Sequence, residues 1–125
     1  MNSVKFARGV FLAAGIYGFM VITPLYFLEA VIGRKNPPSI THPEFYYGFV
    51  GLALAWQIAF FVIARDPVRM RPMMLPSLVE KLLYPAATTA LHFQGRLDAV
   101  TWYVSLVDLV FLLLFFLCWR RTAKS

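Results

Sequence analysis

The chain has 125 residues, of which 60% are hydrophobic and 14% are charged, and its formal net charge is +6. Ordinary soluble domains carry about 25% charged residues, so this composition offers too little polar surface for a soluble globule and excludes that class. The basic residues flank apolar stretches instead of forming a patch among polar residues, which excludes a nucleic-acid partner and favours contact with anionic lipid headgroups. We therefore expect residues 1–125 to form a single membrane domain.

Four apolar segments follow one another along the chain, at about residues 10–28, 45–64, 73–93 and 99–119. A helix of about 20 apolar residues is long enough to cross the roughly 30 Å hydrocarbon core of a bilayer. We predict an all-α polytopic membrane protein, an antiparallel bundle of four transmembrane helices. The third segment fits a span least well, because it contains two charged residues and two prolines.

Polar and small residues mark the expected helix ends. Thr41 and Glu44 have the spacing of a capping box, which predicts that Thr41 caps the second helix. Gly95 suits the position after the third helix, and Asp98 suits the cap of the fourth. The links after the second and third helices are short, so neighbouring helices must run antiparallel, and only residues 33–44 are long enough to form a real loop.

The distribution of basic residues predicts the orientation of the bundle. One side of the expected membrane has eight of them: Lys5, Arg8, Arg65, Arg69, Arg71, Arg120, Arg121 and Lys124. The other side has three: Arg34, Lys35 and Arg96. Because cytoplasmic loops carry the excess of lysine and arginine, both termini are expected in the cytoplasm.

Five polar residues are expected at membrane depth: Gln57 in the second helix, Glu80, Lys81 and Tyr84 in the third, and Asp108 in the fourth. A charge near the bilayer centre costs at least about 2.5–3.5 kcal/mol, so it rarely lacks a partner. The helical rise places Lys81 about 13 Å and Asp108 about 18 Å from the cytoplasmic face, which predicts an ion pair between them. Consecutive helical side chains diverge, so Glu80 is expected near Gln57 and Tyr84 instead of Lys81.

Two interpretations of these five residues remain open. They form either a site that binds a ligand headgroup or relays protons, with Glu80 as the favoured residue, or a structural ion pair. In a variant of the structural interpretation, Lys81 extends along its apolar stem to the membrane surface.

Four further candidates lie toward the outer side: Glu29, His42, Glu44 and His92. The two histidines and Glu44 suggest a metal site, but they lack the spacing of a known metal motif and fit solvated interfacial residues better. No catalytic or nucleotide-binding motif is present. We therefore predict no metal, no cofactor and no enzymatic activity.

Residues 24–29, 37–49 and 64–72 resemble segments of small bacterial four-helix integral membrane proteins of uncharacterised activity. This resemblance implies a bacterial inner or plasma membrane and no particular activity. The four spans with intramembrane acidic residues are also similar in architecture to the sterol-isomerase and sigma-2-receptor group, whose members bind amine-bearing or sterol-like ligands in a polar pocket.

The expected function is that of a membrane protein whose internal polar site binds a small hydrophobic or lipidic molecule. One alternative is a proton-coupled carrier or a subunit of an oligomeric transporter. The oligomer is considered because four helices alone are too few to enclose a wide transport pathway. Another is a structural or assembly subunit of a membrane complex, in which the polar residues only fix helix register. The expected partners are membrane lipids, a hydrophobic small molecule and further copies of the chain.

Overall fold

The computed structural model describes residues 2–124, and this part of the chain is helical without any strand. The α-helices are α1 (Ser3–Ile22), α2 (Glu29–Lys35), α3 (Pro43–Arg65), α4 (Met74–Phe93), α5 (Ala99–Ser105) and α6 (Val107–Arg121). Short 3₁₀ turns follow α1, precede α4 and follow α6: η1 (Thr23–Phe27), η2 (Arg71–Met73) and η3 (Thr122–Lys124). The all-α prediction is therefore confirmed.

Three helical stretches are long and apolar enough to cross a membrane: Ser3–Phe27, Pro43–Arg65 and Ala99–Arg121. They correspond to the first, second and fourth expected spans, and the first ends one residue earlier than expected. The third expected span, residues 73–93, forms the helix α4, but α4 is not among the helices that qualify by apolar character. The mean hydropathy of α4 is lowered by Glu80, Lys81 and several hydroxyl side chains, which all lie within this helix.

Several helix ends differ from expectation for identifiable reasons. The first helix begins at Ser3, because the Asn2 side chain caps it by accepting a hydrogen bond of 2.8 Å from the Val4 amide. The prediction that Thr41 caps the second span is wrong, because His42 directly precedes α3 and no side chain caps this helix. Pro43 occupies the first turn, where its fixed φ favours the helix and its missing N–H leaves no amide to satisfy.

The predictions for Gly95 and Asp98 at helix ends are confirmed. Gly95 follows α4 with φ of 74°, a left-handed conformation that suits glycine. Asp98 caps α5 by accepting a hydrogen bond of 2.9 Å from the Thr101 amide. The expected loop over residues 33–44 is shorter than predicted, because α2 extends to Lys35.

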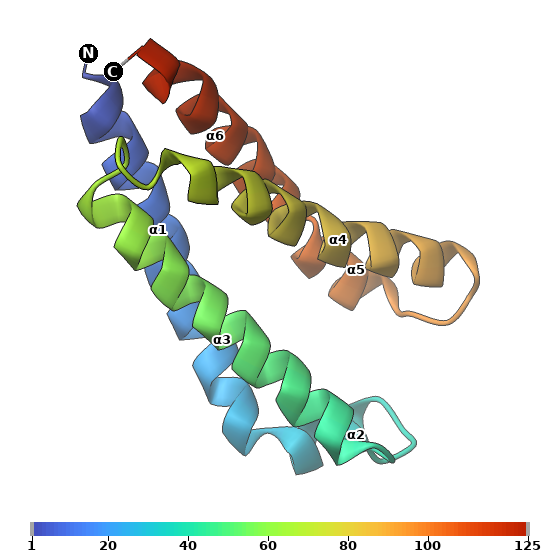
Figure 1. Ribbon diagram of the computed structural model, residues 1–125. Helices are drawn as coiled ribbons and strands as arrows, with labels where there is room; N and C mark the ends of the chain where they lie inside the picture. The colour runs from blue at the N-terminus through green and yellow to red at the C-terminus, as the bar shows by residue number, and fades with distance from the viewer. Residues whose placement is uncertain (1, 125) are drawn as a thin grey trace.

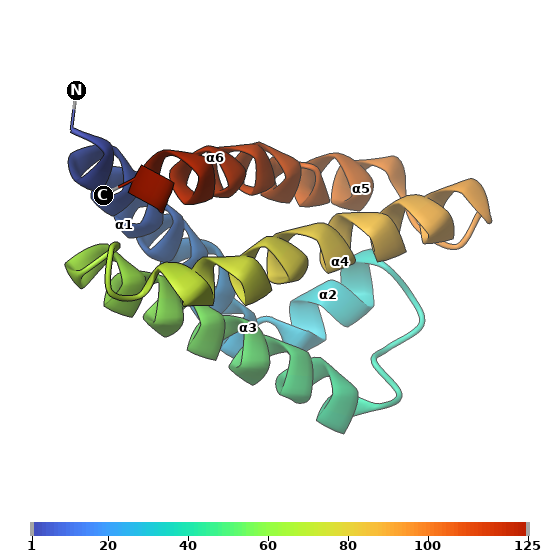
Figure 2. The ribbon, with the colours of Figure 1, turned by 45° about the horizontal axis from the view of Figure 1, so that its top comes forward.

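The helices form two antiparallel pairs that meet at one end and diverge at the other (Figure 1). In the first pair α1 packs along α3, and in the second α4 packs along α5 and α6. The two termini and the link between α3 and α4 lie at the end where the pairs meet, and a second view shows the same divergence (Figures 1 and 2). We call these pairs the first hairpin (α1 with α3) and the second hairpin (α4 with α5 and α6).

Aromatic packing joins the two hairpins where they meet. The ring of Phe11 stacks on Phe115 with centroids 4.2 Å apart, and Phe60 meets Phe115 edge-on at 5.0 Å. All three rings are fully buried, together with Met74 and Cys118. Among the described residues, this buried cluster lies near the junction and does not extend between the divergent parts of the two hairpins.

Candidate functional site

A cavity of about 230 Å³ lies where the two hairpins begin to diverge, and we call it the polar cleft. Residues of α1 and α3 line one wall, and residues of α4, α5 and α6 line the other. Most of the wall is apolar, with side chains such as Val21, Leu25 and Phe49. All five residues expected at membrane depth also line it: Gln57, Glu80, Lys81, Tyr84 and Asp108.

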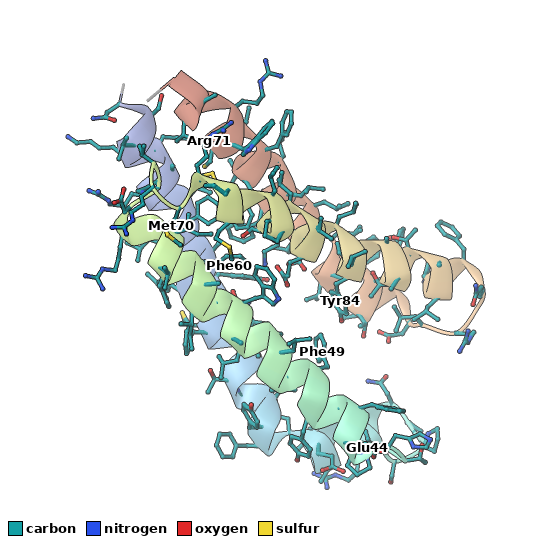
Figure 3. All side chains as sticks on the ribbon, in the orientation of Figure 1. Glu44, Phe49, Phe60, Met70, Arg71 and Tyr84 are labelled. Atoms are coloured by element: carbon teal, nitrogen blue, oxygen red, sulfur yellow. The ribbon has the colours of Figure 1, made fainter. Side chains whose placement is uncertain are left out.

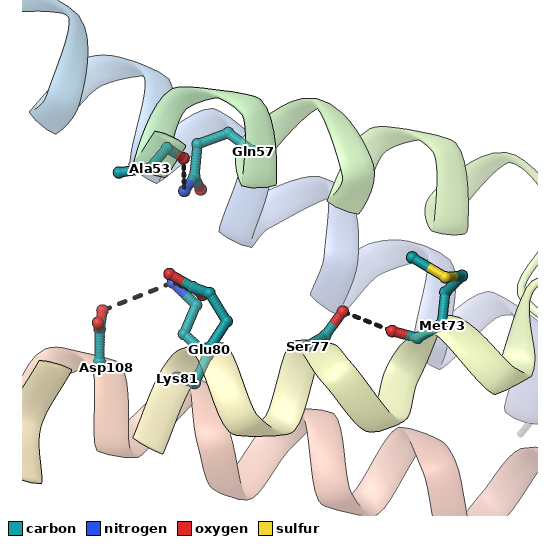
Figure 4. A network of polar contacts seen from close by, with 7 residues as sticks. All are labelled: Ala53, Gln57, Met73, Ser77, Glu80, Lys81 and Asp108. Atoms are coloured by element: carbon teal, nitrogen blue, oxygen red, sulfur yellow. Dashed lines mark hydrogen bonds and ion pairs between the residues drawn. The ribbon is translucent and has the colours of Figure 1, made fainter. Parts of the chain in front are cut away.

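Lys81 lies between two carboxylates at the base of the polar cleft. Its Nζ atom is 3.5 Å from Asp108 Oδ1 and 3.6 Å from Glu80 Oε1 (Figure 4). The expected contact with Asp108 is therefore present. The expectation that Glu80 points away from Lys81 is wrong, because the long lysine side chain bends to a position where both carboxylates reach it.

The surroundings of Lys81 are apolar apart from these two carboxylates. The residue is only 4% exposed, so its side chain does not extend to the molecular surface as the alternative interpretation proposed. Its ammonium lies 5.0 Å from the centroid of the Phe60 ring and 5.5 Å from that of Phe111. Aromatic faces attract a cation and partly replace its lost hydration, so four side chains hold this ammonium in place.

The polar cleft contains two buried oxygen atoms that accept no hydrogen bond within the described residues: Gln57 Oε1 and Glu80 Oε1. The amide of Gln57 is oriented by a hydrogen bond of 2.8 Å that its Nε2 atom donates to the Ala53 carbonyl. The Gln57 amide and the Glu80 carboxylate point toward each other across the space between α3 and α4 (Figure 4). Leaving a buried acceptor unpaired costs about 1–3 kcal/mol, so such atoms indicate a place where a donor is missing.

A glycine allows Gln57 to take this position. Gly18 of α1 faces the Gln57 side chain so closely that a Cβ atom at Gly18 would collide with it. The neighbouring Gly15 packs in the same way against the Phe61 ring, 2.6 Å from where its Cβ would lie. Gly18 and Tyr17 were not predicted as residues of the site, because they carry no charge and no motif assigns them to it.

Tyr84 lies nearer the mouth of the polar cleft. Its ring stacks on Phe49 of the first hairpin with centroids 5.6 Å apart, so these two aromatics connect the hairpins beyond the charged residues. Both are partly exposed, and both extend into the space between α3 and α4 (Figure 3). Other polar groups on the second hairpin are satisfied internally, as in the 2.7 Å contact between the hydroxyls of Thr88 and Ser105.

The four outer candidates do not join the polar cleft. Glu29 accepts a hydrogen bond of 2.9 Å from the Tyr47 hydroxyl, which ties α2 to α3. His42 and Glu44 are exposed and 3.8 Å apart. His92 stacks on Trp102 with centroids 4.4 Å apart, on the second hairpin, whereas the other three belong to the first (Figure 1). Among the described residues, no three His, Cys, Asp or Glu side chains are grouped to hold a metal ion.

Comparison with known proteins gives no match: no protein-family model, no curated protein and no solved structure. The chemistry of the site must therefore be argued from its own atoms. Two carboxylates and one ammonium give the cluster a formal charge of −1, and the two buried oxygens without a hydrogen bond are both acceptors. The polar cleft is thus complementary to a molecule with an apolar body and a headgroup that donates hydrogen bonds or carries positive charge.

Proposed function

We propose that the chain is an integral membrane protein of four transmembrane helices, with α4 as the fourth. The two charged residues of α4, Glu80 and Lys81, line the polar cleft, and Ser77 and Thr88 are buried inside the molecule. Its outward residues are large and apolar: Leu75, Val79, Leu82 and Leu83. Twenty residues at 1.5 Å each also give α4 a length of about 30 Å, which matches a bilayer core. Hydropathy averaged around the helix therefore underestimates how well α4 fits lipid.

The proposed orientation has both termini and the link between α3 and α4 in the cytoplasm. These parts lie together at one end of the molecule, as four antiparallel spans require (Figure 1). That end also has most of the arginines and lysines. A bacterial inner or plasma membrane fits the resemblance of residues 24–29, 37–49 and 64–72 to small bacterial membrane proteins.

Within this membrane protein, the polar cleft binds a small hydrophobic or lipidic molecule. The observation that carries the proposal is a pair of buried oxygens that accept no hydrogen bond, Gln57 Oε1 and Glu80 Oε1, in a cavity with largely apolar walls. Glu80 Oε1 has the Lys81 ammonium at 3.6 Å as a charge partner, whereas no charged group of the described residues pairs with Gln57 Oε1. Ligand sites are usually clefts with apolar walls and a few convergent polar groups. The cavity is somewhat smaller than the usual range of about 300–1,000 Å³, so it fits a headgroup and a short chain better than a large lipid.

The formal charge of the cluster favours a cationic headgroup over an anionic one. Glu80 and Asp108 share a single ammonium at 3.5–3.6 Å, longer than the roughly 2.7–2.9 Å of a charge-assisted hydrogen bond. A second positive group would satisfy the carboxylate that Lys81 balances only in part. Tyr84 and Phe49 would then contact the apolar part of the ligand.

The thermal stability of the purified protein in a neutral detergent tests this function. Decylamine, 1-decanol and decanoate share one chain and differ in the headgroup, and each is added at the same concentration below its own aggregation threshold. We expect decylamine to raise the midpoint of unfolding most and decanoate least. Glu80→Gln should abolish the difference among the three, while Glu44→Gln, at an exposed carboxylate, should preserve it. Equal responses to all three in the wild type would refute the proposal.

A proton-coupled carrier is the second candidate, because the shared ammonium leaves one carboxylate free to exchange a proton. It predicts flux driven by a pH gradient in proteoliposomes, and this flux should disappear in Glu80→Gln. A ligand that stabilises the protein without any such flux would favour simple binding.

A further inference from the structure

A second depression, of about 460 Å³, lies at the C-terminal end of α3 and shares no residue with the polar cleft. Its lining consists of Val62, Arg65, Asp66, Arg69 and Met70. We propose that this depression binds the phosphate group of an anionic glycerophospholipid, with an acyl chain lying along Val62. The proposal rests on the membrane topology proposed above, and it does not depend on ligand binding in the polar cleft.

Arg65 and Arg69 differ from the other arginines at this end of the molecule. Four of those have guanidinium groups that contact the protein: Arg8, Arg71, Arg120 and Arg121. Arg71, for example, donates hydrogen bonds of 3.0 and 2.7 Å to the Trp119 carbonyl. In the part of the chain that the structure describes, no hydrogen bond or ion pair engages the side chain of Arg65 or Arg69, and both residues are exposed. Their donors are thus available to a phosphate.

The negative groups next to these arginines already have partners. Asp66 Oδ1 accepts a hydrogen bond of 3.3 Å from the Arg69 amide. The Ala64 carbonyl, at the negative end of the α3 dipole, accepts one of 3.1 Å from Arg8 Nε. Two arginines and one aspartate leave the lining with a formal charge of +1. The depression therefore attracts an anion despite its position at a helix C-terminus.

The position of the depression along α3 favours a lipid over a free anion. Arg65 is the last residue of the candidate span Pro43–Arg65, so the proposed topology puts its guanidinium at the level of the lipid phosphates. Val62 lies one turn earlier, within the span, and is 45% exposed. The depression thus combines a cationic half at the interface with an apolar half in the hydrocarbon. A phosphate joined to acyl chains matches both halves, whereas inorganic phosphate matches only the first.

Native mass spectrometry of the protein released from neutral detergent tests this site. Phosphatidylglycerol is titrated against phosphatidylcholine of the same chain length, and soluble glycerol phosphate serves as the headgroup alone. A juxtamembrane arginine adds about a fivefold gain in anionic-lipid binding. We therefore expect the double variant Arg65→Gln/Arg69→Gln to weaken the first phosphatidylglycerol adduct about twenty-five-fold. Arg120→Gln, whose guanidinium lies over Phe116, is the matched control and should change it less than threefold.

Three results would overturn the proposal. Unchanged phosphatidylglycerol binding by the double variant would place the lipid elsewhere. A loss of about fivefold in Arg120→Gln, the value for any juxtamembrane arginine, would mean that net charge alone governs binding. Binding of glycerol phosphate as tight as that of phosphatidylglycerol would assign the depression to a free phosphate compound. Both arginines are exposed, and a circular dichroism spectrum equal to that of the wild type would show that the double variant is folded.

Discussion

Removing Lys81 should destabilise the protein more than removing either of its partners. Lys81→Met leaves two carboxylates, Glu80 and Asp108, without a cation in a largely apolar cleft. Stranding a buried charge costs about 3–5 kcal/mol. Asp108→Asn, in contrast, leaves Glu80 and Lys81 as a neutral pair 3.6 Å apart, so it should cost less than about 1.5 kcal/mol.

The strength of the Lys81–Asp108 interaction can be estimated from its distance. At 3.5 Å, Coulomb's law gives about 5 kcal/mol for an effective dielectric constant near 20 and about 1 kcal/mol in water. The Asp108 side chain is 20% exposed, so the environment lies between these limits. We expect a coupling free energy of about 2–3 kcal/mol.

A double-mutant cycle with Lys81→Met and Asp108→Asn measures this coupling through the free energy of unfolding in mixed detergent micelles at neutral pH. A second cycle that combines Lys81→Met with Glu44→Gln is the control, since Glu44 is exposed and has no contact with Lys81. Additive losses in the first cycle, within about 0.5 kcal/mol, would refute the pair. A larger loss for Asp108→Asn than for Lys81→Met would refute the shared-ammonium arrangement.

Three further predictions concern packing, pH and topology. Gly18→Ala should destabilise the protein by about 1–3 kcal/mol in the same unfolding assay, because the added Cβ collides with the Gln57 side chain. Gly9→Ala is the control, and it should be neutral or slightly stabilising because no atom lies within 4 Å of the added Cβ. Hydrogen bonds from the amide and hydroxyl of Thr101 lower the pKa of Asp98, so its contribution to stability is complete above its unfolded value of about 3.9 and is lost as pH falls through the lower folded value. Unfolding at a series of acidic pH values should show a smaller stability loss for Asp98→Asn, and an unchanged profile would contradict this assignment. The orientation can be tested with single cysteines on a Cys118→Ser background. A cysteine at position 69 should react only with reagents that reach the cytoplasm, and a cysteine at position 95 only with external reagents. The reverse pattern would overturn the orientation.

The sequence predicts the helices well because long apolar runs leave few alternatives in lipid. Residues 45–64 and 99–119 fall within the helical stretches Pro43–Arg65 and Ala99–Arg121. Helix ends are harder to predict, since each depends on one or two local contacts. Asn2 starts α1 early through a side-chain hydrogen bond, and Pro43 makes the predicted cap at Thr41 unnecessary.

The candidate site was predictable in composition but not in geometry. Charges in apolar runs need partners, and this alone identified Lys81 and Asp108. The position of Glu80 was predicted wrongly because helical spacing gives the direction of the Cβ atom, whereas a lysine ammonium can bend several ångströms away from that direction. The four-residue spacing of Ala14 and Gly18 predicts close helix contact, but the sequence does not reveal that Gly18 makes this contact with Gln57 at the site.

The divergence of the two hairpins was not predictable from the sequence. It depends on where bulky rings fill the space between helices, and only the packed structure locates Phe11, Phe60 and Phe115 at one end. The cavity therefore follows from tertiary packing, although its charged residues could be recognised in the sequence.

Photolabelling of the protein in lipid nanodiscs tests most directly whether the polar cleft binds a cationic amphipathic molecule. The probe is a decylamine that carries a diazirine on its chain, and labelled peptides are mapped by mass spectrometry with and without excess unlabelled decylamine. We predict competable labelling of Phe49 and Tyr84 that is lost in Glu80→Gln and retained in Glu44→Gln. Labelling confined to exposed residues outside the cleft, such as Phe93 and Val110, and unaffected by competitor or by Glu80→Gln, would contradict the proposed function.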